Sequence, residues 1–450
     1  MIIVGLGTVW ILDGLEVTIV GNLAPKLGES GSGVDITSGQ VSGFGASIYV
    51  IGACSGALFF GWLTDRFGRK KLFMITLGVY LAGTALTALS WTAWWFYFCR
   101  FLTGFGIGGE YAAINSAIDE LIPSKHRGRV DIAINGSYWA GAAVGALLTI
   151  PLLSDLPVHL GWRFAFGLGV VLGLVILVVR RHVPESPRWL IIHGRTQNAE
   201  QLVRDAERIA SHEGTRQLSE PRGEITIRQR RTVGFALIGK VLFTHYPKRA
   251  ILGFSLFIGQ AFLYNAITFG FADILDKFFD AGNTGYYYAV ISVGNFLGAL
   301  SLAPLFDSIG RRKMISGTYI LSGVLLLGTA LLFDQGVLTA VTLTACWSVV
   351  LFFASAGASS AYLTVSEIFP METRAMAISF FYAIGTAAGG ITGPLVFSRL
   401  VGTGVPRDTA LAFTIGAVIM IAAGLVEVVL GVNAERKGLE SIARPLTQEG

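Results

Sequence analysis

Five ionisable residues lie in stretches of sequence that are otherwise apolar: Asp13, Glu16, Arg100, Glu110 and Glu427. An ionisable side chain inside an apolar layer costs about 3 kcal/mol or more, so each of them marks a candidate functional site. Carboxyl groups in such surroundings can bind and release protons, and a nearby guanidinium holds a carboxylate in its charged form. No histidine lies deep in an apolar stretch. The sequence therefore predicts that any proton relay in this chain uses carboxylates.

The elements that hold these residues are long apolar segments. Of the 450 residues, 53% are hydrophobic and only 14% are charged, whereas soluble domains carry about 25% charged residues. A helix of about 20 apolar residues crosses the hydrocarbon core of a bilayer. Twelve such segments are predicted, at residues 2–24, 41–61, 72–90, 94–117, 130–153, 162–181, 249–272, 285–306, 314–333, 338–363, 375–399 and 410–432. We therefore expect an all-α, polytopic membrane protein.

One gap between the predicted spans is long. Residues 182–248 are polar and rich in arginine, and "NAEQLVRDAERIA" within them has helical periodicity. The gap separates a six-helix bundle at 1–181 from a second at 249–432, and a tail follows at 433–450. Because 28 of the 34 lysines and arginines fall on the side of the long gap, that loop and both termini are predicted to be cytoplasmic.

This orientation lets the depth of the charged residues be estimated from the helical rise of about 1.5 Å per residue. Asp13 then lies near the midplane, and Glu110 lies about 6 Å towards the cytoplasm. Glu16 and Arg100 lie about 6 and 9 Å towards the outside, so they can pair. An acid released from such a pair into a dry cavity takes up a proton. Asp13 can instead be a structural acid, and Glu427, near the end of the last span, can extend to the surface.

Two pairs of charged motifs recur in the two predicted bundles. "GWLTDRFGRKK" at 61–71 corresponds to "APLFDSIGRRK" at 303–313. "ELIPSKHR" at 120–127 corresponds to "EIFPMETR" at 367–374, and both read E-x-x-P-x-x-x-R. The offsets are 242 and 247 residues. Two motif pairs at nearly one offset indicate two homologous halves that arose by duplication.

Together with "PESPRWL" at 184–190 and "RFLTGFGIGG" at 100–109, these motifs resemble the major facilitator superfamily, and within it the sugar-porter and metabolite:proton symporter branch. The resemblance covers nearly the whole chain and implies the twelve-helix fold of that superfamily, with transport by alternating access. It also implies that the loop motifs form a cytoplasmic gate between the halves. The candidate gating residues are Asp65, Arg66, Arg69, Glu120, Arg127, Asp307, Arg311, Glu367 and Arg374. Alternatively, these charges only set the orientation of the chain.

The resemblance also implies roles for the charges within the spans. "GLEVTIVG" resembles the first helix of the sugar porters and places Glu16 at their proton-binding acid, where they carry aspartate. "RFLTGFGIGG" places Arg100 at the partner of that acid, and "DGLE" at 13–16 also resembles the D-G-x-D of aromatic-acid symporters. The candidate proton-coupling residues are therefore Glu16, Arg100, Asp13 and Glu110. The alternative is that Glu16 and Arg100 form a static pair.

Polar and aromatic side chains in the spans are expected to line a substrate path. The candidates are Asn135, Tyr138, Trp139, Gln260, Tyr264, Asn265, Asn295, Tyr362 and Tyr382. "QAFLYNAITF" keeps the Q-x-x-x-x-N spacing of the sugar porters' seventh helix, but Leu263 replaces their glycine and Tyr362 their usual tryptophan. Any single aromatic residue here can serve packing alone. A sugar or polyol and an organic acid both remain open, since a free Arg100 would suit a carboxylate and a neutralised one a polyol.

The predicted function is secondary active transport, namely proton-coupled uptake of a small polar organic solute. Uptake is favoured because "NGSYWAGAAVGALL" lacks the proline that efflux antiporters carry in the fifth span. The alternatives are a uniporter or proton antiporter of the same fold and, more remotely, a non-transporting membrane sensor. No enzyme motif matches, and neither a metal, a cofactor nor a nucleic acid is expected. The chain is expected to act as a monomer in the cell membrane, with its solute, protons and lipid as partners.

Overall fold

The computed structural model describes residues 2–122, 127–180, 185, 187–192, 194–213, 239–370, 374–435, 437 and 442–443. Within these residues the regular structure is helical and no β-strand occurs. Each predicted span overlaps one long helix of the described chain. The first six helices are α1 (Ile2–Leu27), α2 (Ala46–Phe67), α3 (Arg69–Ala88), α4 (Ala93–Leu121), α5 (Arg127–Ser154) and α6 (Val158–Arg180). The second six are α10 (Pro247–Phe279), α11 (Thr284–Ser308), α12 (Arg311–Asp334), α13 (Ala340–Ile368), α14 (Arg374–Gly402) and α15 (Pro406–Leu430).

Ten of these helices are long and apolar enough to cross a membrane within the described residues. Helices α1 and α4 are not among the ten, and they are the helices that carry Asp13, Glu16, Arg100 and Glu110. All four side chains are at most 1% exposed, because α1 packs against α5, α6 and α10 while α4 packs against α2 and α3. The charges therefore face protein rather than lipid. The prediction of an all-α polytopic membrane protein is confirmed.

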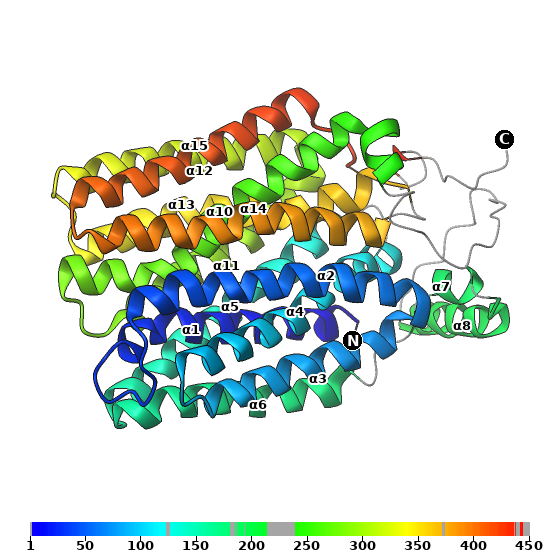
Figure 1. Ribbon diagram of the computed structural model, residues 1–450. Helices are drawn as coiled ribbons and strands as arrows, with labels where there is room; N and C mark the ends of the chain where they lie inside the picture. Colours follow the sequence, from blue (N-terminus) through cyan, green and yellow to red (C-terminus); the bar gives the residue numbers. More distant parts are fainter. Residues whose placement is uncertain are drawn as a thin grey trace.

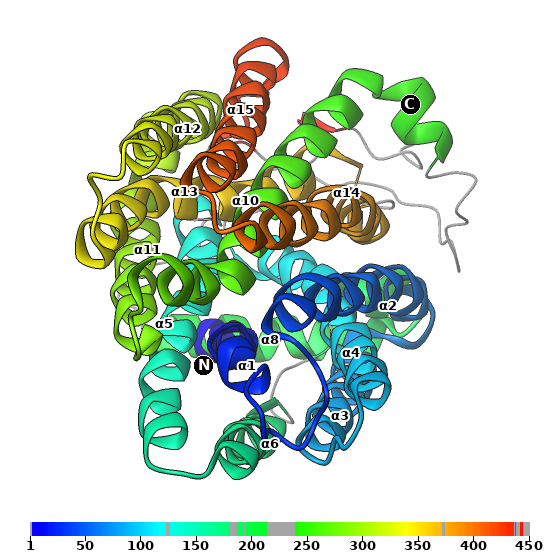
Figure 2. The same ribbon diagram turned by 60° about the vertical axis from the view of Figure 1, so that its left-hand side comes forward.

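The helices form two groups that lie side by side, α1–α6 in one and α10–α15 in the other (Figures 1 and 2). Across the boundary, α5 packs against α11 and α2 packs against α14. The fifth helix of each group thus contacts the second helix of the other. This reciprocal pairing is what a duplicated six-helix unit produces when its copies are related by a two-fold axis.

Glycines set the close crossing of α1 and α5, which positions the buried acids. A Cβ atom on Gly14 would lie 1.9 Å from the carbonyl oxygen of Tyr138, and one on Gly141 would lie 1.7 Å from that of Ile11. Any larger side chain would push the helices apart, as in other tightly packed membrane helices.

Short helices distinguish the two ends of the bundle. Helices α7 (Pro187–Ile192) and α8 (Thr196–Glu213) lie beyond one end, here named the α8 end (Figure 1). Helix α8 confirms the predicted helix in the long gap, and the π-helical turn η2 (Val241–His245) leads from this end into α10. The other end, named the η1 end, holds the π-helical turn η1 (Gln40–Gly45), which continues into α2. Turns of this type inside α-helices are frequent at functional sites.

Candidate substrate cavity and its charged surroundings

A cavity of about 130 Å³ lies between the two groups of helices. Its wall comes from α1, α2, α4 and α5 on one side and from α10, α13 and α14 on the other. Eight of its lining residues are aromatic: Trp10, Tyr49, Tyr111, Tyr138, Trp139, Tyr264, Tyr362 and Tyr382. The others are Val17, Val50, Ala53, Asn135, Gln260, Asn265, Thr268, Ser355, Ala358, Ser359 and Thr386. Both groups therefore supply aromatic rings and hydrogen-bonding groups to one shared cavity.

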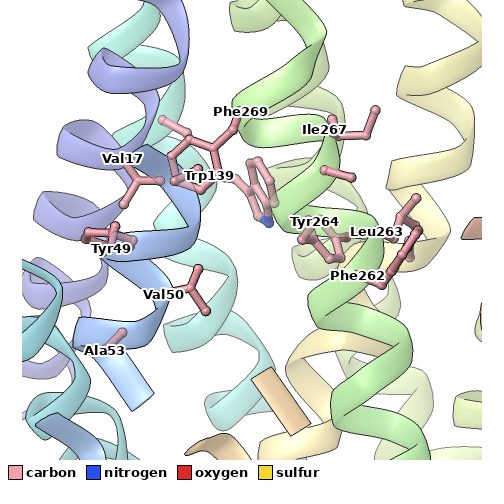
Figure 3. Close-up of a cluster of buried hydrophobic side chains, with 14 of the residues drawn as sticks. Val17, Tyr49, Val50, Ala53, Trp139, Phe262, Leu263, Tyr264, Ile267 and Phe269 are labelled. Atoms are coloured by element: carbon pink, nitrogen blue, oxygen red, sulfur yellow. The ribbon is translucent and has the colours of Figure 1, made fainter. Parts of the chain in front are cut away.

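The structure brings eight of the nine predicted substrate-path residues to this cavity. The eight are Asn135, Tyr138, Trp139, Gln260, Tyr264, Asn265, Tyr362 and Tyr382. Trp139 and Tyr264 face each other across the boundary (Figure 3), with ring centroids 5.2 Å apart. Asn295 does not line the cavity. It is fully buried behind it, and its Oδ1 accepts a hydrogen bond of 3.2 Å from the Tyr264 hydroxyl, so it positions Tyr264.

Several lining residues were missed by the sequence analysis, above all Trp10, Tyr49 and Tyr111. Trp10 stacks on Tyr111 with centroids 4.7 Å apart and an interplanar angle of 17°. One signal was available, because Trp10 precedes Asp13 by three residues and must share its helix face. For Tyr49 in α2 the sequence carries no comparable signal.

Glu16 and Arg100 form the predicted ion pair. Arg100 Nη1 lies 2.5 Å from Glu16 Oε1, and both side chains are 1% exposed. The guanidinium also lies over the ring of Tyr49, with its Cζ 4.6 Å from the ring centroid. Neither charged residue lines the cavity, but Tyr49 does. A movement of Tyr49 would therefore change its contact with Arg100, and through Arg100 the ion pair with Glu16.

Asp13 lies one layer behind the cavity wall. Its Oδ1 accepts a hydrogen bond of 3.3 Å from the Tyr49 hydroxyl, and its Oδ2 accepts one from the Tyr111 hydroxyl. Both tyrosines line the cavity. Tyr49 thus contacts Asp13 through its hydroxyl and Arg100 through its ring face, which joins the two buried acids of α1 into one network.

The two remaining acids of the spans lie elsewhere. Glu110 is buried, accepts a hydrogen bond of 3.3 Å from Thr76 in α3, and does not line the cavity. The expectation that Glu427 extends to the surface is wrong. Its side chain is fully buried on α15, and neither carboxylate oxygen has a hydrogen-bond partner in the described chain. Helix α12 packs along α15 there and covers it.

At the α8 end, a charged network joins the two groups. Arg311 Nη1 lies 2.8 Å from Asp307 Oδ1, and Arg311 Nε lies 3.1 Å from Glu367 Oε2. Two contacts then cross to α5: Arg127 Nη1 lies 3.8 Å from Glu367 Oε1, and the Arg129 backbone N–H donates to Asp307 Oδ2 at 3.0 Å. The structure thus gathers four of the predicted gating residues.

Of the other predicted gating residues, the structure describes the side chain of Arg374 alone. Arg374 is buried and donates to the Phe369 carbonyl at 3.4 Å. The side chains of Asp65, Arg66, Arg69 and Glu120 lie outside the described residues. A glycine fits the network closely, since a Cβ on Gly128 of α5 would lie 2.2 Å from Arg311 Nη1. The guanidinium therefore packs directly on the α5 backbone.

At the η1 end, a single carboxylate joins the groups. Asp273 of α10 accepts hydrogen bonds from Ser38 and from Ser42 of η1, the latter at 2.5 Å. Ser398 of α14 donates to the Gly39 carbonyl at 3.0 Å. The predicted span ends at 272, so this cluster is not expected from the sequence, but α10 continues to Phe279 and includes Asp273. The cavity is therefore bounded by contacts between the groups at both ends.

Comparisons with known proteins agree with this architecture. Residues 22–444 match the family described as sugar (and other) transporter. The chain is 28% identical to a niacin transporter of Acinetobacter baylyi, covering 98% of this chain and 95% of that protein. It is 26% identical to an arabinose-proton symporter of Bacillus subtilis, covering 90% and 86%.

Among solved structures, the chain matches a proton:xylose symporter of the major facilitator superfamily bound to 6-bromo-6-deoxy-D-glucose. The TM-score is 0.76 at 17% identity, and the match covers 98% of this chain and 97% of that one. The shared fold and the family match identify a multi-pass membrane transporter rather than an enzyme. The chain belongs to the sugar (and other) transporter family and has the major facilitator fold.

Proposed function

We propose that this chain takes up a small polar organic solute together with protons by alternating access. The observation that carries the proposal is the cavity between the two groups, two of whose lining tyrosines hydrogen-bond to a buried carboxylate. Solute in the cavity would touch groups that hold Asp13 and, through Tyr49, the pair of Glu16 and Arg100. Two relatives named as proton symporters, of arabinose and of xylose, support coupling to protons.

Glu16 is the proposed proton carrier and Arg100 its switch partner. The guanidinium, 2.5 Å away, gives the Glu16 carboxylate a charged partner. Solute that shifts Tyr49 removes the ring on which Arg100 rests, and the guanidinium moves with it. The carboxylate is then left in a dry site and takes up a proton. A neutral Glu16 lowers the cost of closing the cavity towards the other side. Asp13 is the next candidate carrier, and Glu110 follows it.

The two helix groups are the proposed moving bodies. They comprise residues 1–181 and 249–432, joined by a cytoplasmic loop at 182–248 and followed by a cytoplasmic tail at 433–450. The lysine and arginine distribution supports this orientation in the plasma or inner membrane. The α8 end is then the cytoplasmic gate and the η1 end the outer gate. The protein acts as a monomer in this scheme.

Reconstitution with electrical recording, together with a separate assay of solute uptake into the same liposomes, tests the proposal. Purified protein in liposomes is adsorbed on a solid-supported membrane. Solutes are then applied at an acidic pH of about 5.5 and at an alkaline pH of about 8. A transported neutral solute that carries protons generates inward positive current, larger at acidic outside pH. Solute flux without current and without dependence on a pH gradient would instead indicate the alternative, a uniporter with a static Glu16–Arg100 pair.

A further inference from the structure

The wall of the cavity carries no positive charge. Of the described residues that line it, none is lysine, arginine or histidine. Arg100 is held by Glu16 at 2.5 Å and is not part of the wall. Asp13 lies directly behind Tyr49 and Tyr111. A solute with a free carboxylate would lose its hydration, meet no cation and approach a buried acid, which is strongly unfavourable.

Neutral polar groups in the wall lack protein partners. The indole N–H of Trp10 and the hydroxyl of Thr386 are buried without a hydrogen bond in the described chain. The Gln260 amide makes none within the described residues, and Asn265 uses only its Nδ2, donating to the Ala261 carbonyl at 2.9 Å. Buried polar groups are normally paired. These donors and acceptors are therefore available to form hydrogen bonds with a ligand, and none of them carries a charge.

The size and lining of the cavity favour one flat ring. A volume of about 130 Å³ is close to that of the engineered cavity of about 150 Å³ that holds benzene. Eight of the nineteen lining residues are aromatic, and such rings pack best against another ring, stacked or edge-on. A ring with one polar substituent would fill the space and still reach the amides of α10.

We propose that the cavity selects an uncharged, flat, single-ring solute that bears a carboxamide-like group, and that it discriminates against the carboxylate of the same ring. The proposal rests on the transport function proposed above and narrows its substrate class. A carboxamide both donates and accepts hydrogen bonds, as the unpartnered groups of Gln260, Thr386 and Trp10 require. A polyol can satisfy the same groups but has no flat face.

Benzamide, benzoate and myo-inositol are matched probes of charge and shape. Binding to the full chain in detergent at pH 7.5 is measured by calorimetry and by the fluorescence of the tryptophans, two of which line the cavity. Benzamide is expected to bind at least about tenfold more tightly than benzoate, which remains ionised, and than myo-inositol. Equal or tighter binding of benzoate or of myo-inositol, or binding of none of the three, overturns the proposal.

Two threonine-to-valine substitutions on α14 test whether benzamide binding depends on the cavity wall. Thr386→Val removes a cavity hydroxyl and is expected to weaken benzamide binding about fivefold. Thr392→Val removes an exposed hydroxyl that bonds to the Ala388 carbonyl and should leave binding unchanged. In addition, Gln260→Lys should reverse the preference in favour of benzoate. An unchanged preference in a variant that melts as a folded protein contradicts the assignment.

The binding assay separates this inference from the proposed function, since it needs neither a membrane nor a proton gradient. If benzamide is preferred but acid outside drives no uptake, the selectivity stands and the proton coupling fails. If a carboxylate is preferred and is driven by protons, the coupling stands and the selectivity fails.

Discussion

The two ends of the cavity are closed by different chemistry. At the α8 end, the guanidinium groups of Arg311 and Arg127 share Glu367, and Asp307 accepts a backbone N–H from the other helix group. At the η1 end, the carboxylate of Asp273 accepts only serine hydroxyls. Acids lie at both ends, but within the described residues only the α8 end pairs its acids with guanidinium groups.

This difference affects how readily each end opens. Separating a buried ion pair leaves two charges that must be hydrated or paired again. Water can replace a serine hydroxyl at a carboxylate with little loss, because it offers an equivalent donor. We therefore expect the η1 end to open first and more often, and the α8 end to open only when its charges find new partners.

The largest effect is expected from Glu367→Gln. The substitution removes the charge that Arg311 and Arg127 share, and breaking one side of a buried pair costs about 3 kcal/mol or more. Transport in liposomes should fall more than tenfold, and the melting temperature should drop. The matched control is Glu207→Gln on the exposed face of α8, which should behave as wild type. If the Glu367→Gln protein were fully active, the charged network at the α8 end would not act as a gate.

Glu16→Gln tests the buried ion pair behind Tyr49, between the two ends. The amide mimics a permanently protonated acid, so the cavity should still alternate between its two openings. Exchange of labelled solute without a gradient should survive, whereas accumulation driven by acid outside should vanish. Glu427→Gln changes another buried acid, one that does not line the cavity, and should keep coupling. If Glu16→Gln still concentrates solute, the proton moves through Asp13 or Glu110.

The sequence predicted the charged end far better than the serine end, for a physical reason. Glu367 and Arg127 belong to motifs that recur in both halves, and recurrence separates them from ordinary surface charges. Ser38 precedes the predicted span at 41–61, Ser42 is its second residue, and neither belongs to a motif that recurs in the other half. Asp273 falls one residue beyond the predicted span, where a hydropathy pattern does not distinguish a helix end from a loop.

The amide residues of the cavity wall are easier to predict from the sequence than its aromatic residues. Gln260 and Asn265 stand out because amides are rare in apolar spans, whereas Tyr49 does not differ from a packing residue in sequence alone. The fold itself followed from hydropathy, because a backbone in lipid must satisfy its own hydrogen bonds and a long apolar segment has to be helical. Which face of each helix turns inward depends on contacts such as that of Gly14 with Tyr138.

An intermediate effect is expected from Gly128→Ala. The new methyl group would overlap Arg311 Nη1, at 2.2 Å from the added carbon, and must push the guanidinium away from α5. Overpacking of this kind costs about 1–3 kcal/mol, so transport should slow severalfold and the melting temperature should fall. Gly317→Ala on α12, where the added carbon meets nothing within 4 Å, is the control. Equal behaviour of the two variants would show that α5 and Arg311 are not held closely together.

The smallest effect is expected at the η1 end, from Ser42→Ala. The variant loses one hydroxyl that donates to Asp273 at 2.5 Å, worth about 1 kcal/mol, while Ser38 still donates to the same carboxylate. The outward-open population should rise about fivefold. A cysteine placed at Thr268, in a cysteine-free background, reports this as faster labelling by a membrane-impermeant maleimide. Ser55→Ala on α2, whose hydroxyl bonds only within its own helix at 2.8 and 2.9 Å, should label at the parental rate. Slower labelling in Ser42→Ala, or no change, would mean that the serines do not hold this end closed. The two gates would then not differ in the way their chemistry predicts.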